Sequence, residues 1–136
     1  MSAMSDYLEG EIRKHVFRTG SFTKPSALWV ALFTAAPSDS GGGTEVAGGS
    51  YARVQRDPLD ANWTAASATD GKTDNAAAVT FPSPSGSWGL VSHFAIFDAP
   101  SGGNLLIHGA LTVPKTVNAS DPAPAFAIGA LAITFA

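Results

Sequence analysis

The sequence contains no cysteine, few charged residues and no long apolar run. Without cysteine the chain has neither a disulfide framework nor a thiolate metal site, so its stability must come from packing and assembly. No window approaches the roughly 18 apolar residues that a membrane-spanning helix needs. We therefore expect no membrane partner.

Positive charge is also scarce, because the formal net charge is −3. A broad basic field would be needed to bind phosphate groups through counterion release, so we expect no nucleic-acid partner. The basic residues between positions 13 and 24 stand beside acidic residues, which is typical of the solvated face of a helix.

The residues that are abundant are small or break regular structure. The 136-residue chain has 14 glycines and 9 prolines, with only 14% charged residues, which disfavours a helical bundle. Glycine, serine, threonine and alanine must then form much of the surface, and such a surface suits coverage by other subunits. The length fits one domain, residues 1–136.

The first 20 residues predict the one helix we expect. Leu8, Ile12 and Val16 recur four apart between positions 5 and 17, the spacing of one helical face. Ser5 or Asp6 can cap the start, and Gly20 stands where a left-handed C-terminal cap would end the helix. The apolar face is narrow, so we expect it to pack against the sheet or a neighbouring subunit.

Residues 26–136 predict a domain of β-strands. A short apolar run at 28–34 predicts a central strand buried on both faces. Turn-rich segments separate it from the other candidate strands, which are residues 51–55, 77–81, 91–98, 105–111, 115–117 and 125–135. The predicted fold is mainly β, an antiparallel β-sandwich or jelly-roll-like barrel of about seven or eight short strands with one N-terminal α-helix.

Two long loops interrupt this pattern. Residues 36–43 contain proline, serine, aspartate and three glycines, all of which favour turns. Residues 57–74 are polar and alanine-rich with weak periodicity, and are predicted to be a long excursion with, at most, short edge strands. Long loops of this kind often lie at contacts.

No arrangement of residues predicts an enzyme or a cofactor. The glycines at 41–43 lack the following Lys-Ser or Lys-Thr of a phosphate-binding loop. His15, His93 and His108 have no metal-ligand spacing, and His93 and Asp98 would point to opposite faces of one strand. We therefore expect neither catalysis nor a bound metal.

The tryptophans outside the core leave three interpretations open. Trp29 stands in the most apolar run and is predicted to be in the core, whereas Trp63 and Trp88 fall in loops. The loop tryptophans could pack a corner, anchor a subunit contact or stack on a sugar. We favour a subunit contact. The candidate contact residues come from the helix face, the loop at 36–43 and the two loop tryptophans. They are Leu8, Ile12, Val16, Pro37, Asp39, Trp63 and Trp88.

Several segments resemble a family of short proteins in tailed-bacteriophage genomes, whose members are commonly labelled phage structural or tail-fibre proteins. The resemblance rests on residues 4–9, 28–46, 49–53 and 75–82, on 88–89, 94–98, 102–106 and 109–115, and on the final strand. It covers nearly the whole chain apart from about 57–74. It implies a virion protein made in the bacterial host cytoplasm, with no catalytic residues to carry over.

The position within the particle is a separate prediction. A fibre shaft normally shows heptads, Gly-X-Y triplets or a short β-helix period, and none is present. We therefore predict a compact head decoration (cement) protein on the outer capsid surface, a homotrimer or higher homo-oligomer bound to the major capsid protein. The first alternative is a tail-fibre, collar or baseplate component bound to tail proteins, and the second is a sugar-binding receptor module using Trp63 and Trp88.

Overall fold

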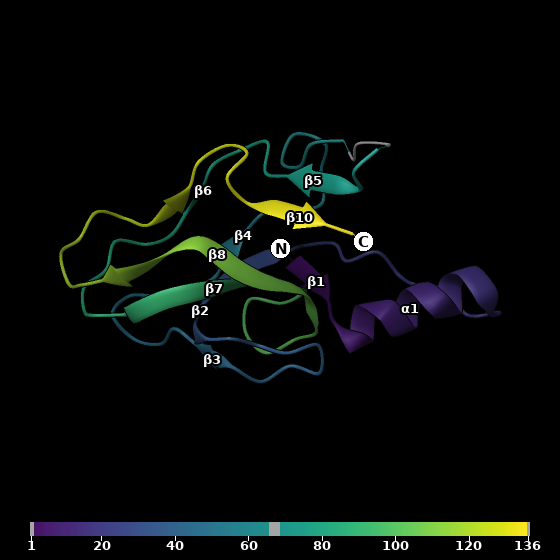
Figure 1. The fold of residues 1–136 in the computed structure, drawn as a ribbon, viewed down its shortest axis with the longest axis horizontal. Coiled ribbons are helices and arrows are strands. Elements are labelled where there is room, and N and C mark those ends of the chain that lie inside the picture. Colours follow the sequence, from purple (N-terminus) through teal and green to yellow (C-terminus); the bar gives the residue numbers. More distant parts are fainter. Residues whose placement is uncertain (1, 66–68, 136) are drawn as a thin grey trace.

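The computed structural model describes residues 2–65 and 69–135. It confirms a mainly β fold with antiparallel sheets and one helix near the N-terminus, consistent with a β-sandwich (Figure 1). The elements in chain order are β1 (Ser2–Met4), α1 (Asp6–Phe17), β2 (Trp29–Ala35), β3 (Thr44–Glu45), β4 (Val54–Gln55), β5 (Lys72–Asp74), β6 (Val79–Thr80), β7 (Gly89–Phe97), β8 (Leu105–Val117), β9 (Ala125–Phe126) and β10 (Ala132–Thr134).

The main sheet has the strand order β1-β8-β7-β2-β3, and β4 also pairs with β2. Strand β2 is central, with Val30 opposite Ile96 and Leu32 opposite Phe94 on β7. Residues 30–33 are buried, which confirms the predicted strand covered on both faces. An apolar run without alternation forms because both of its faces exclude water.

Each face of the main sheet carries its own apolar core. The larger core lies between one face and the two small sheets, β6-β9 and β5-β10, which contribute Val79, Phe126 and Ile133. The smaller core lies on the other face and contains Phe33 and Leu105, with Phe97 packed against it. The second layer is thus made of strands of two or three residues.

Helix α1 begins where predicted, but its C-terminal cap differs from the prediction. The Ser5 hydroxyl accepts a hydrogen bond from Leu8 N at 3.1 Å and caps the helix. The helix ends at Phe17, and Arg18 follows in an extended conformation, so the predicted left-handed cap at Gly20 is wrong. Gly20 is instead close to the helix, because a Cβ there would lie 2.5 Å from Cγ of Lys14.

Two predicted strands, 105–111 and 115–117, are one strand in the structure. Strand β8 pairs with β7 along its length, and the pairing shifts between Val91, opposite Lys115, and His93, opposite Ala110. The extra residues of β8 form a bulge there. Strand β1, which the sequence did not predict, adds to the edge of β8, with Ala3 opposite His108.

The predicted final strand, 125–135, is wrong as a single element. It divides into β9 and β10, which pair with different partners, β6 and β5. Buried Asn75 holds the turn between them: its amide donates to Ala127 O at 2.9 Å, and its side-chain oxygen accepts from Leu131 N at 2.9 Å. Gly129, with φ +79°, lets the chain reverse.

Two other predictions were partly right. The strand at 51–55 shortens to β4, and the excursion at 57–74 is mostly irregular and ends in β5. Residues 66–68 of that excursion lie outside the described part of the chain. Among the described residues, no helix combines the length and the hydropathy needed to cross a membrane.

Candidate contact surfaces

Helix α1 projects as an arm from the three sheets, which together we call the β-body (Figure 1). The apolar face of the helix is only partly covered. We call residues 6–17 the helix arm. Leu8, at its base, is buried in the larger core, so it is not available to a neighbouring subunit as predicted. Further along, Ile12 is partly exposed and Val16 is 61% exposed. Phe17, which the sequence analysis did not single out, is 80% exposed.

An apolar groove lies between the base of the helix arm and the β-body. Its volume is about 810 Å³. Predicted contact residue Trp63 is partly buried in its wall, where the indole N–H donates to Arg56 O at 3.3 Å. The described residues that line the groove are mostly apolar: Leu8, Phe22, Pro25, Leu28, Pro58, Leu59, Asp60, Trp63, Thr64, Ala65, Thr73, Ala76, Ile96, Leu106, Ile107, Ile133 and Phe135.

The loop at 36–43 forms a compact turn next to the start of the helix arm. Pro37 is buried, so it does not offer the surface contact predicted for it. Asp39 is exposed, as a contact residue should be, but it already has partners within the chain. Its carboxylate lies 2.8 Å from Nε2 of His108, and its carbonyl accepts from Asp6 N at 2.9 Å.

The predicted subunit contact at Trp88 is wrong, and so is the alternative in which its ring stacks on a sugar. Trp88 is only 4% exposed, donates to Gly49 O at 2.9 Å and packs edge-on against Tyr51. It is a corner-packing residue and presents no free ring face to a subunit or a sugar. Trp29, predicted to be in the core, is only partly buried.

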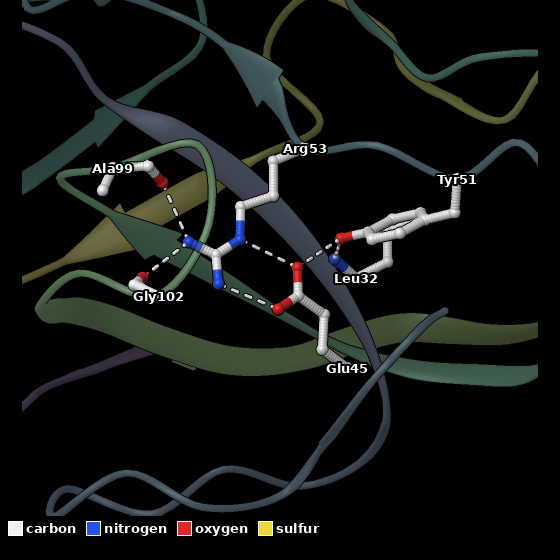
Figure 2. A network of polar contacts seen from close by, with 6 residues as sticks. All are labelled: Leu32, Glu45, Tyr51, Arg53, Ala99 and Gly102. Atoms are coloured by element: carbon white, nitrogen blue, oxygen red, sulfur yellow. Dashed lines mark hydrogen bonds and ion pairs between the residues drawn. The ribbon is translucent and has the colours of Figure 1, made fainter. Parts of the chain in front are cut away.

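A polar cluster around the Arg53 side chain joins strand β3, the segment between β3 and β4, and the loop between β7 and β8 (Figure 2). Arg53, whose side chain is 6% exposed, makes a bidentate pair with Glu45, with both N···O distances 2.8 Å. Its third nitrogen donates to Ala99 O at 2.8 Å and Gly102 O at 2.9 Å. The guanidinium also lies 3.7 Å above the ring of Phe97. We call this the Arg53 cluster.

Tyr51 completes the Arg53 cluster. Its hydroxyl donates to Glu45 Oε1 at 2.9 Å and accepts from Leu32 N at 3.0 Å (Figure 2). Burial of the phenol, together with the charge and hydrogen bond of Glu45, raises the pKa of Tyr51 well above its usual range. Sequence reasoning missed this cluster. The available signal was Glu45 and Arg53, opposite charges placed among apolar segments in a chain with few charges.

The three histidines lie in separate settings. His15 Nδ1 accepts from Phe22 N at 3.1 Å, and His93 Nδ1 lies 2.8 Å from the Ser92 hydroxyl. His108 pairs with Asp39. Asp98, considered above beside His93, instead accepts two hydrogen bonds from Asn104. In residues 2–65 and 69–135, no three His, Asp or Glu side chains lie close enough to hold a metal ion.

Comparison with known proteins gives the family. The model of the family described as Podophage GP4 fiber I protein gp80 matches residues 3–134. This chain belongs to that family. A search of curated proteins finds no match. The fiber I family membership confirms the resemblance to phage virion structural proteins, and it makes the chain a fibre-type component of a phage virion, where its partners are other virion proteins.

Family membership also bears on the choice between head and tail. The fiber I family favours the tail-fibre alternative over the head decoration protein that we predicted first. The head position was predicted because no shaft repeat is present. A fibre can, however, contain compact domains without a repeat, so the absence of a shaft repeat does not distinguish a tail-fibre protein from a head decoration protein.

Proposed function

We propose that this protein is a structural component of a phage tail fibre, a compact domain that joins other virion proteins and carries out no reaction. The match of residues 3–134 to a fiber I family carries this proposal. Fold alone would not support it, since small β-sandwiches serve many functions.

The structure supports a role in assembly in two ways. The β-body is held by its own apolar cores and the Arg53 cluster, so it can present a fixed surface. In contrast, the helix arm and the apolar groove expose large apolar side chains, which is typical of surfaces that bind other proteins. We infer that the chain is made in the host cytoplasm and enters the virion as a homotrimer or higher homo-oligomer.

Labelled particles test the position in the virion. A phage carrying the gene with an affinity tag in the exposed turn at 118–120 would be decorated with gold and imaged by electron microscopy. Label confined to the tail supports the proposal, whereas label spread over the shell identifies a head decoration protein. Deletion of the gene should give particles with intact heads that lack a fibre density.

A further inference from the structure

The exposed apolar side chains gather in one region of the molecule. Nine large hydrophobic residues are exposed among those described. Four of them lie on the helix arm, and two, at positions 59 and 135, lie at the groove rim. These six are Tyr7, Ile12, Val16, Phe17, Leu59 and Phe135. Leu59 at the rim is 58% exposed. Monomeric proteins seldom leave such a concentration uncovered.

The helix arm cannot fill the groove of its own chain. Leu8 is fixed in the groove wall and in the larger core, so the arm starts at the groove. Figure 1 shows that the arm then runs away from the β-body. Val16 and Phe17, at the far end of the arm, are 61% and 80% exposed and do not line the groove. The apolar face of the arm and the apolar groove cannot cover each other within one molecule. The arm of one copy can, however, cover the groove of a second copy.

Charge favours the same pairing. The far half of the arm carries Arg13 and Lys14, and Arg18 follows its last residue. Of these three, only Lys14 has an ion pair among the described residues, with Glu11 at 2.7 Å. The groove has one charged residue in its described lining, Asp60. A basic helix end thus faces an acidic residue when the arm of one copy enters the groove of another.

We propose that the helix arm of one copy docks in the apolar groove of a second copy of this chain. In a closed ring of three or more copies, each arm enters the next groove. The contact places Val16 and Phe17 against Leu59 and Trp63. This interface does not depend on which part of the virion the protein occupies, so it can stand or fall separately from the proposed function.

Sedimentation of the purified full chain tests the interface. The wild type should associate, and Val16→Ser combined with Phe17→Ser should weaken association roughly a hundredfold, because two apolar side chains lose their burial. Leu59→Ser, on the groove side, should weaken association at least tenfold. Val113→Ser, an exposed apolar residue outside the arm and groove, is the matched control and should leave association unchanged.

Cross-linking identifies the two partners of the contact. The natural chain has no cysteine. Copies with Val16→Cys, mixed with tagged copies carrying Leu59→Cys, should therefore form one disulfide-linked product on oxidation. Replacing the second variant by Val113→Cys should abolish that product. A wild type that stays monomeric would overturn the proposal, and would leave the arm to be covered by another virion protein. An arm variant that still associates, or an equal loss of association with Val113→Ser, would also overturn it.

Discussion

The Arg53 cluster and the helix arm differ in how they use charge and apolar surface. In the Arg53 cluster, the Arg53 side chain is buried, and every nitrogen of its guanidinium meets an acceptor on Glu45, Ala99 or Gly102. On the helix arm, Val16 and Phe17 lie in water although they are apolar, while Arg13 and Arg18 are exposed beside them.

The difference separates what holds the chain together from what the chain offers to partners. A buried charge is tolerated only when it is fully paired, so the Arg53 cluster is complete within one chain. Exposed apolar groups stabilise a structure only when a partner removes them from water, so the apolar face of the arm needs a partner. Substitutions in the two regions should therefore affect different measurements.

The largest effect is expected at the centre of the Arg53 cluster. Arg53→Ala leaves Glu45 without its ion pair and two carbonyls without donors, and should lower the free energy of unfolding by about 3 kcal/mol. Urea unfolding followed by tryptophan fluorescence measures this. The matched control, exposed Arg13→Ala, should change the free energy of unfolding by less than about 0.5 kcal/mol. A loss below about 1 kcal/mol for Arg53→Ala would instead indicate an ordinary surface ion pair.

Ser5 joins the helix arm to the main sheet, since it caps the arm and binds strand β8. Its hydroxyl donates to Leu105 O, and its backbone N–H donates to Leu106 O at 2.9 Å. Ser5→Ala should lower the free energy of unfolding by about 1–2 kcal/mol, because the cap at Leu8 N and a buried hydrogen bond are both lost. Circular dichroism should also show reduced helix content. Exposed Ser26→Ala is the control, and an equal effect there would contradict the role of Ser5.

Tyr51 makes the Arg53 cluster sensitive to alkaline pH. Its pKa is raised in the folded chain, so between the unfolded pKa near 10 and the higher folded pKa the folded chain binds more protons than the unfolded chain. Its contribution to stability is therefore complete below about pH 10 and declines as the pH rises further.

Tyr51→Phe tests this dependence. At pH 7 it should cost about 1 kcal/mol, because Leu32 N and Glu45 lose a hydrogen bond. The difference in stability between wild type and Tyr51→Phe should then shrink as the pH rises from 10 to 11.5. Exposed Tyr7→Phe is the control, and it should leave the pH profile of the wild type unchanged. A constant difference across that range would show that Tyr51 does not ionise with unfolding.

The smallest effect on stability is expected at the end of the helix arm. Val16→Ser combined with Phe17→Ser should change the free energy of unfolding by less than about 0.5 kcal/mol at a protein concentration where the wild type is dissociated. The same variant should strongly weaken association, as argued above. A loss of stability of the dissociated chain comparable to that of Arg53→Ala would place these side chains in the fold itself.

Local patterns in the sequence determined much of the fold. The period of Leu8, Ile12 and Val16 specified the helix, and Ser5 specified its start. The apolar run at 28–34 specified a central strand, since a short apolar run without polar alternation needs both of its faces covered. These features depend on the backbone period and on nearest neighbours, which a linear sequence records directly.

Features that depend on distant partners were decided only by the tertiary structure. The alternation at 125–135 indicates one strand, but buried Asn75, more than 50 residues earlier in the chain, divides it into two. Trp88 and Pro37 stand in polar loops by sequence, yet both are covered by the folded chain.

The contact surfaces divide in the same way. The sequence by itself determined that the helix carries an apolar stripe, because side-chain spacing alone sets which residues share a face. Which residues of that stripe stay exposed was decided by the tertiary structure, since Leu8 enters the core and Val16 does not. The apolar groove also exists only in three dimensions, where segments from both ends of the chain and its middle meet around it. Burial depends on every neighbour in space, and the sequence lists only the neighbours along the chain.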